Sequence, residues 1–352
     1  MARLRDKVIR AGFETIYLSG AHELLRRFVG GVGMILTFHH VRPERTDVFQ
    51  PNKLLEVTPE FLALVVEILR QAEVDLVSLD EMYRRMAERD FARRFACLTL
   101  DDGYRDNKEH AYPVLRRLDV PFAIYVPTSF IERRGELWWL VLEAVIASKN
   151  EVSLQIDGVV RTFACAAPDE KQQTYSNIYS WLRRLPTYDA IRMRVRDLAV
   201  RYNVDLSSTY DKLCMTWAEL SEIAKDPLVT IGAHTVNHPI LAKCEPDVVR
   251  REISDGAQRI ALHLGRRPEH FSYPVGDPTS AGQREFEIVR DIGFKTAVTT
   301  RPGVLFPEHR DHMLALPRLS INGDYQDQRY VEVLLSGTAT ALWNKFRHVN
   351  AA

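Results

Sequence analysis

The feature that most constrains the fold is a regular alternation of short apolar runs with amphipathic segments, which begins at Met34. Strands that alternate with helices favour a parallel sheet, because each helix supplies the crossover between two strands. At 352 residues, the chain is long enough for one large α/β barrel with an insertion, or for two ordinary domains. Runs rich in β-branched and aromatic residues predict strands over 34–38, 74–77, 95–100, 121–126, 229–233, near 271, and over 294–299 and 314–321.

Signals for helix ends separate these runs. Ser78, with Glu81 three residues later, predicts a capping box, and Pro59 fits the first turn of a helix after Thr58. Gly265 and Gly293 are typical residues at the ends of helices. We also expect a helix over 107–118.

The overall charge excludes partners that bind through a global field. Lys plus Arg and Asp plus Glu both number 47, so nothing favours nucleic acid or another polyanion. No apolar run approaches the ~18 residues that would span a bilayer. The four cysteines lie far apart with no C-x-x-C pair, which fits reduced thiols in the cytoplasm better than a zinc knuckle or a disulfide framework.

The N-terminal segment 1–33 has a basic start but no signal peptide, because charged residues such as Glu14 and Arg26 interrupt the apolar core that a signal requires. Residues 6–29 instead predict one amphipathic helix. We expect this helix to pack on its own domain, with peripheral contact to a membrane as the alternative. Residues 326–352 are expected to form a C-terminal helical tail.

The alternation stops over residues 131–215, which predicts an insertion on a loop of the barrel. Its pattern predicts a helix over 137–148, a hairpin over 152–163 that turns at Asp157-Gly158, and a helix over 181–202. Three tryptophans of the insertion either stack on sugar rings or form its small core, namely Trp138, Trp139 and Trp181.

Two adjacent carboxylates, Asp101 and Asp102, follow a wholly apolar run and precede Gly103. The carboxyl ends of strands hold the active site of a parallel barrel. Adjacent carboxylates repel unless a cation or a proton lies between them, so a metal ligand beside a general base explains the pair. The alternative is a loop in which Asp caps the following helix.

Two histidines, His234 and His238, also follow an apolar run. Imidazoles four residues apart can bind one cation, but the glutamate of an H-E-x-x-H helix is absent, so a base must come from elsewhere. One Asp with two His gives three protein ligands and an open position, as catalytic zinc sites have. Asp101 is the available base.

Further candidates follow later strands or the first one. Tyr273 and Pro274 belong to a tight loop that could line a sugar site or present backbone amides to an oxyanion, although such a loop is also an ordinary turn. Arg318 could pair with a carboxylate at the mouth or form a structural ion pair. His39 or His40 could protonate a leaving amine or belong to the core.

The motifs Leu98-Thr99-Leu100-Asp101-Asp102-Gly103-Tyr104, His234-Thr235-x-x-His238-Pro239 and Phe271-x-Tyr273-Pro274-x-Gly276 occur in this order. With them the chain resembles the polysaccharide deacetylase family, the NodB homology domain or carbohydrate esterase family 4, over about 34–130 and 215–325. The resemblance implies a distorted (β/α) barrel of about seven parallel strands within 34–325. It also implies metal-dependent removal of acetyl groups, usually N-acetyl from N-acetylglucosamine units. Asp102, His234 and His238 would bind zinc, and Asp101 would be the base that activates water.

Two departures from the family pattern affect the expected roles. The third motif lacks an early Arg, and the late strand reads Leu314-Ala315-Leu316-Pro317-Arg318 where relatives often carry the acid histidine in L-x-His. We therefore expect Arg318 to orient Asp101, and His39, His40 or metal-bound water to supply the proton. Val275 stands where related loops often have a second aromatic residue.

Other functions remain open at this point. A non-catalytic carbohydrate-binding barrel would explain the missing acid, and a de-O-acetylase would use the same site on another bond. A glycosidase is disfavoured, because adjacent Asp101 and Asp102 cannot flank a glycosidic bond from ~5 Å apart or more. The expected partner is an acetylated oligosaccharide or polysaccharide.

Overall fold

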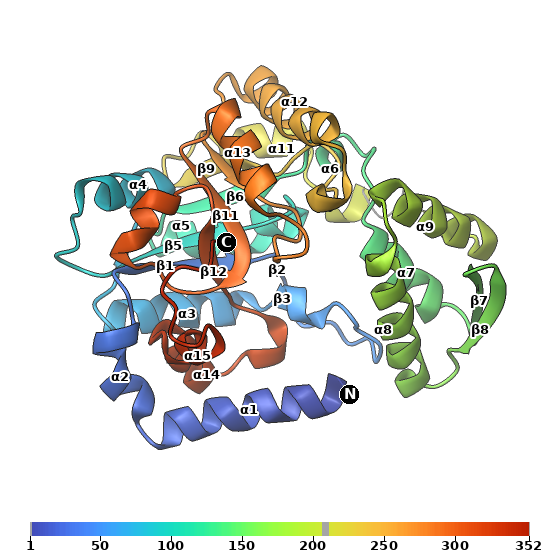
Figure 1. Ribbon diagram of the computed structural model, residues 1–352, viewed down its shortest axis with the longest axis horizontal. Helices are drawn as coiled ribbons and strands as arrows, with labels where there is room; N and C mark the ends of the chain where they lie inside the picture. The colour runs from blue at the N-terminus through green and yellow to red at the C-terminus, as the bar shows by residue number, and fades with distance from the viewer. Residues whose placement is uncertain (1, 206–210, 352) are drawn as a thin grey trace.

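A closed barrel of seven parallel strands forms the centre of the computed structural model, which describes residues 2–205 and 211–351 (Figure 1). The order around the barrel is β1 (Gly33–Phe38), β12 (Leu316–Ser320), β11 (Thr296–Pro302), β10 (His270–Ser272), β9 (Val229–Ala233), β6 (Phe122–Val126) and β5 (Phe95–Leu100). Strand β5 pairs back with β1 from Gly33–Phe95 to Phe38–Leu100, which closes the barrel. The predicted distorted (β/α) barrel is therefore confirmed. Every residue of β1 and β5 is buried, which explains their apolar sequences.

Helices cover the outside of the barrel. They are α3 (Pro59–Gln71), α4 (Leu79–Glu88), α5 (Tyr112–Arg117), α6 (Thr128–Ile131), α11 (Trp217–Ile223), α12 (Pro246–Leu264) and α13 (Gln283–Ile292). Ser78 Oγ accepts a hydrogen bond from the Glu81 amide at 3.2 Å, as the capping signal predicted. Gly265 and Gly293 end α12 and α13 with φ of 72° and 91°. Short strands β4 (Asp75–Leu76), β2 (His40–Val41) and β3 (Glu56–Val57) complete the regular elements of the barrel.

The helix expected over 107–118 forms, but its first part is π-helical. Residues Asn107–Ala111 form a π-helical turn, and α5 begins only at Tyr112. The Asn107 side chain is buried and donates a 2.7 Å hydrogen bond to the His39 carbonyl. The wider turn thus places a side chain under the end of β1, and π-turns of this kind often occur at functional sites.

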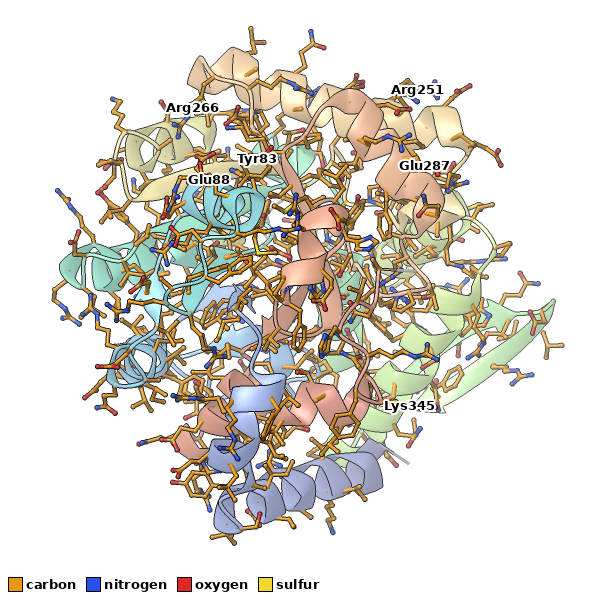
Figure 2. The ribbon with its side chains drawn as sticks, turned by 60° about the vertical axis from the view of Figure 1, so that its left-hand side comes forward. Tyr83, Glu88, Arg251, Arg266, Glu287 and Lys345 are labelled. Carbon is orange, nitrogen blue, oxygen red and sulfur yellow. The ribbon has the colours of Figure 1, made fainter. Side chains whose placement is uncertain are left out.

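The insertion forms a separate layer at one side of the barrel (Figures 1 and 2). It consists of α7 (Trp138–Ala147), β7 (Glu151–Ile156), β8 (Val159–Ala164), α8 (Pro168–Arg184) and α9 (Tyr188–Tyr202). The hairpin turns at Asp157 and Gly158 as predicted, with φ of 51° and 82°. The single helix predicted over 181–202 is wrong. Pro186 lies between α8 and α9, where its missing N–H and its ring favour a break.

Trp138, Trp139 and Trp181 are buried, with exposed fractions of 1%, 7% and 7%. They belong to the apolar cluster that the insertion encloses. Their position supports the alternative in which they form a core, because buried rings offer no free face to a sugar.

The predicted N-terminal helix 6–29 is two helices, α1 (Ala2–Leu18) and α2 (Ala21–Val29), separated at Gly20, whose φ is 68°. Phe13 of α1 packs on Tyr330 and Val333 of α14 (Gln328–Leu335), so this helix does pack on its own domain. The expected tail 326–352 contains α14 and α15 (Thr338–Trp343). Among the described residues, no helix has the length and apolar character needed to span a bilayer.

We expect Trp181→Ala to lower the free energy of unfolding by about 3–5 kcal/mol, because the substitution leaves a cavity in the insertion core. Urea denaturation followed by circular dichroism measures the change. Val200→Ala is the matched control, since Val200 is exposed on α9. Equal denaturation midpoints for the two variants would contradict a core role for Trp181.

Candidate active site

The mouth of the barrel gathers polar side chains from four strand ends. Asp101 and Asp102 follow β5, His234 follows β9, and Ser272 ends β10. Arg318 lies within β12 and reaches the same place. All five are buried. Because the strands are parallel, their carboxyl ends meet, as the sequence predicted for the first three residues.

Asp101 is held by a two-pronged salt bridge. Arg318 donates from Nη1 to Oδ1 at 2.8 Å and from Nη2 to Oδ2 at 2.6 Å. Ser272 Oγ lies 3.3 Å from Oδ2 as a third donor. Burial raises the pKa of Asp101, but the Arg318 guanidinium outweighs it and holds that pKa well below its usual range. Asp101 is therefore a carboxylate at neutral pH.

Asp102, His234 and His238 form a cluster whose ligand atoms all lie within 4.8 Å of one another. Asp102 Oδ1 is 3.7 Å from Nε2 of His234 and 3.4 Å from Nε2 of His238. His234 Nδ1 bonds the Ser272 carbonyl at 2.6 Å, so Nε2 is directed toward the carboxylate.

The cluster fits a divalent cation. Within the described residues, Asp102 Oδ1 and His234 Nε2 are buried without a hydrogen-bond partner, an arrangement that costs free energy unless a ligand fills it. Burial lowers the pKa of both His234 and His238, which keeps them neutral and able to coordinate. Burial and the Asp101 charge raise the pKa of Asp102 to about 8, because an ionised Asp102 carboxylate is unfavourable there. A bound cation would stabilise the ionised form. Two imidazoles and a carboxylate are a donor set typical of zinc.

Helix α12 supports the loop that carries the histidines. Glu252 accepts hydrogen bonds from the Asn237 amide at 2.8 Å and from its side chain at 2.6 Å. Gly256 lets the helix approach, because a Cβ there would lie 2.8 Å from the Thr235 carbonyl. Thr235 and His238 have φ of 67° and 56°, a strained conformation that this support maintains.

The two neighbouring histidines have different surroundings. His39 is half-buried and lies in the fields of Asp101, Arg318 and His234. Burial lowers its pKa to about 4 against the opposing effect of Asp101, so the ring is neutral at pH 7. His40 is held elsewhere: Nδ1 lies 2.6 Å from an Asp106 oxygen, and the ring stacks on Tyr104. His39 is thus the histidine of this pair that interacts electrostatically with Asp101.

Tyr273 does not line a sugar site. Its ring is buried, its hydroxyl donates to the Leu314 carbonyl at 2.9 Å, and its amide donates to the Val298 carbonyl at 3.1 Å. Pro274 has no amide hydrogen to offer. Tyr273 and Pro274 therefore offer no free amide hydrogen, which leaves the next residue as the candidate donor. The Val275 amide donates to no group among the described residues, and its φ of 62° is rare for a β-branched side chain.

Comparison with known proteins gives the family. A model described as polysaccharide deacetylase matches residues 88–297, more than half of the chain. The chain belongs to the polysaccharide deacetylase family. No curated protein sequence gave a significant match.

Solved structures of deacetylases share the fold. A Streptococcus pyogenes deacetylase, PplD, in complex with acetate is 19% identical with a TM-score of 0.55, over 82% of this chain and 92% of its own. IcaB from Ammonifex degensii is 17% identical with a TM-score of 0.53, over 86% of this chain and 97% of its own. A de-N-acetylase from Aggregatibacter actinomycetemcomitans is 12% identical with a TM-score of 0.52, over 83% and 96%.

In this deacetylase-family barrel the insertion contacts both catalytic loops, which sequence analysis did not foresee. The Trp139 ring lies 5.1 Å from the His238 ring, and the Tyr188 hydroxyl donates to the Asn237 carbonyl at 3.2 Å. Arg183 donates to Asp277, which follows the Val275 loop, at 2.6 Å. These residues are far apart in the sequence, so no local pattern signals the contacts.

Ser272 was also missed as a site residue, although it stands inside the quoted third motif.

Arg318→Gln is expected to reduce the free energy of unfolding by about 3–5 kcal/mol at pH 7, because a buried carboxylate loses its partner. The folded-state pKa of Asp101 is depressed, so the pair stabilises above the unfolded pKa, ~3.9, and loses this effect as pH falls through the folded value. Without Arg318 the pKa of Asp101 rises, and protonation relieves the penalty at low pH. Urea denaturation should therefore show a smaller difference between wild type and variant at pH 4 than at pH 7. A difference independent of pH would contradict the assignment.

Proposed function

We propose that the protein is a metal-dependent carbohydrate deacetylase, a hydrolase that cleaves the amide C–N bond of N-acetylglucosamine units in an oligosaccharide or polysaccharide. The observation that carries this proposal is the ionised Asp101, held by Arg318, directly beside the Asp102, His234 and His238 cluster. A base and an open three-ligand cluster are the two parts that metal-assisted hydrolysis requires.

Each group at the barrel mouth has a separate role in the proposed hydrolysis. A divalent cation, with zinc first by ligand type, would polarise the acetyl carbonyl and lower the pKa of a water molecule in the open position. Asp101 accepts the proton of the attacking water, and Arg318 orients its carboxylate without competing for that proton. The Val275 amide donates to the oxygen that becomes negative, where charge develops only in the transition state.

His39 is the proposed proton donor to the leaving amine. Its ring is partly exposed and interacts electrostatically with Asp101, and in this proposal it receives the proton that Asp101 takes from water. When the C–N bond breaks, the nitrogen takes that proton, and acetate and a free amine are released. His40 is not needed, since Asp106 and Tyr104 hold it.

Two alternatives are distinguished by chemistry. A carbohydrate-binding barrel without catalysis needs neither an ionised buried Asp101 nor strained loops at the mouth, and such features cost stability. A de-O-acetylase would use the same residues on an ester, whose alcohol needs less help to leave than an amine. The amide is favoured by the role proposed for His39, because a leaving amine needs a proton donor.

The deciding experiment measures acetate release by the purified protein from N-acetylglucosamine oligomers and from O-acetylated glycans, with and without a chelator. We expect release from the N-acetyl substrates, loss with the chelator, and recovery after Zn²⁺ is added. Faster release from O-acetylated glycans would favour the de-O-acetylase. Tight glycan binding with no release from either would support the binding barrel.

Asp101→Asn and Asp102→Asn are expected to affect different properties, the turnover number and the metal content respectively. Asp101→Asn removes the base and should lower kcat by ~10²–10⁴ while the protein keeps about one divalent metal per chain. Asp102→Asn removes a ligand and should lower the metal content, as should the double variant His234→Ala/His238→Ala. Elemental analysis and acetate release on the same preparations test this division. Equal metal loss in the two aspartate variants would contradict it.

A further inference from the structure

Large apolar side chains are exposed on two helices, α2 and α15. Leu24 and Phe28 of α2 are 67% and 64% exposed, and they lie one turn apart on one helix face. Trp343 at the end of α15 and Phe346 just after it are 61% and 60% exposed. The two helices pack against each other, and Phe28 and Phe346 line the same cavity. Exposed aromatic residues gathered in this way mark an interaction surface.

Basic side chains surround these apolar residues. Arg26 and Arg27 of α2 and Lys345 and Arg347 after α15 are exposed, with Lys345 labelled in Figure 2. The Arg27 guanidinium lies 4.6 Å from the centre of the Phe28 ring. Segments 18–30 and 338–348 contain a single acidic residue, Glu23, although the whole chain has 47 acidic and 47 basic residues. The two segments are therefore cationic on a neutral protein, although Glu308 from another element lies 3.3 Å from His348.

We propose that this docking surface, Leu24, Phe28, Trp343 and Phe346 with their basic neighbours, binds the surface of an anionic lipid bilayer. Trp and Phe prefer the boundary between head groups and acyl chains, and Lys and Arg pair with lipid phosphates. A second copy of the chain fits less well. A symmetric contact would bring two cationic surfaces together, and like charges facing each other oppose association.

The docking surface and the candidate active site lie near opposite ends of β1. Helix α2 ends at Val29, shortly before β1 begins at Gly33, whereas His39 follows the other end of the strand. Six residues of β1 at ~3.3 Å each separate the two places by roughly 20 Å. Figure 1 shows α2 and α15 on the same part of the molecule as α1 and α14. Docking through α2 and α15 thus leaves the catalytic mouth uncovered.

The test is co-sedimentation of the full chain with vesicles of phosphatidylcholine alone and of phosphatidylcholine with phosphatidylglycerol. We expect binding to the anionic vesicles that falls as salt is raised. Phe28→Ser/Trp343→Ser should weaken binding at least about ten-fold, and Arg27→Gln/Lys345→Gln should remove the preference for phosphatidylglycerol. Trp343 is the tryptophan most open to solvent, so wild-type emission should shift to the blue on binding.

Val200→Ser/Leu262→Ser is the matched control, because both residues are highly exposed apolar side chains outside the docking surface. This variant should bind as the wild type does. Circular dichroism of each variant confirms that it is folded. The proposal is overturned if the wild type binds neither kind of vesicle, or if all variants bind vesicles equally. It is also overturned if the wild type does not bind lipid and light scattering shows that it forms a dimer which the Phe28→Ser/Trp343→Ser substitutions dissociate. These outcomes do not depend on whether the protein releases acetate.

Discussion

The rest of the site depends on the buried ion pair between Asp101 and Arg318. Two charges removed from water cost several kcal/mol each unless geometry and further hydrogen bonds compensate. Here Arg318 also donates to Thr99 on β5 and to the Thr299 carbonyl on β11, at 3.2 Å and 2.8 Å. The pair therefore joins separate strands at the barrel mouth, and it fixes a carboxylate that stays ionised without solvent. The role of base that we propose for Asp101 requires a carboxylate of this kind.

Ser272 connects this pair with the metal-ligand cluster. Its hydroxyl lies 3.3 Å from Asp101 and 3.1 Å from Arg318, and its carbonyl orients His234. The insertion adds a second constraint from outside, since its helices contact the histidine loop through Trp139 and the Val275 loop through Arg183. Both loops contain residues with positive φ that surrounding contacts must maintain. The insertion thus contributes to the site by holding its loops, in addition to any effect on substrate choice.

The sequence predicts the barrel well because its strands are buried on both faces, so their apolar runs stand out, and because parallel strands bring their carboxyl ends together. The breaks at Gly20 and Pro186 were missed because amphipathic periodicity continues across them, although Pro186 is itself a residue that favours a break. Tyr273 was misjudged for a similar reason. A motif gives the position of a residue in the chain, but whether its ring points to the mouth or into the core depends on packing. Contacts such as Arg183 with Asp277 join distant segments and leave no local pattern.

Closure of the barrel explains how the proton donor that we propose can come from the first strand of the chain. Strand β12 pairs with β1 through Leu36 and Leu319, so the first and last strands of the barrel are neighbours. A side chain after β1 therefore reaches the same mouth as one on β12. Arg318 on β12 holds the carboxylate of Asp101, the proposed base, and His39 after β1 interacts electrostatically with the same carboxylate. The late histidine that the family pattern often carries is then not required, because our proposal assigns its role to a neighbouring strand of a closed ring.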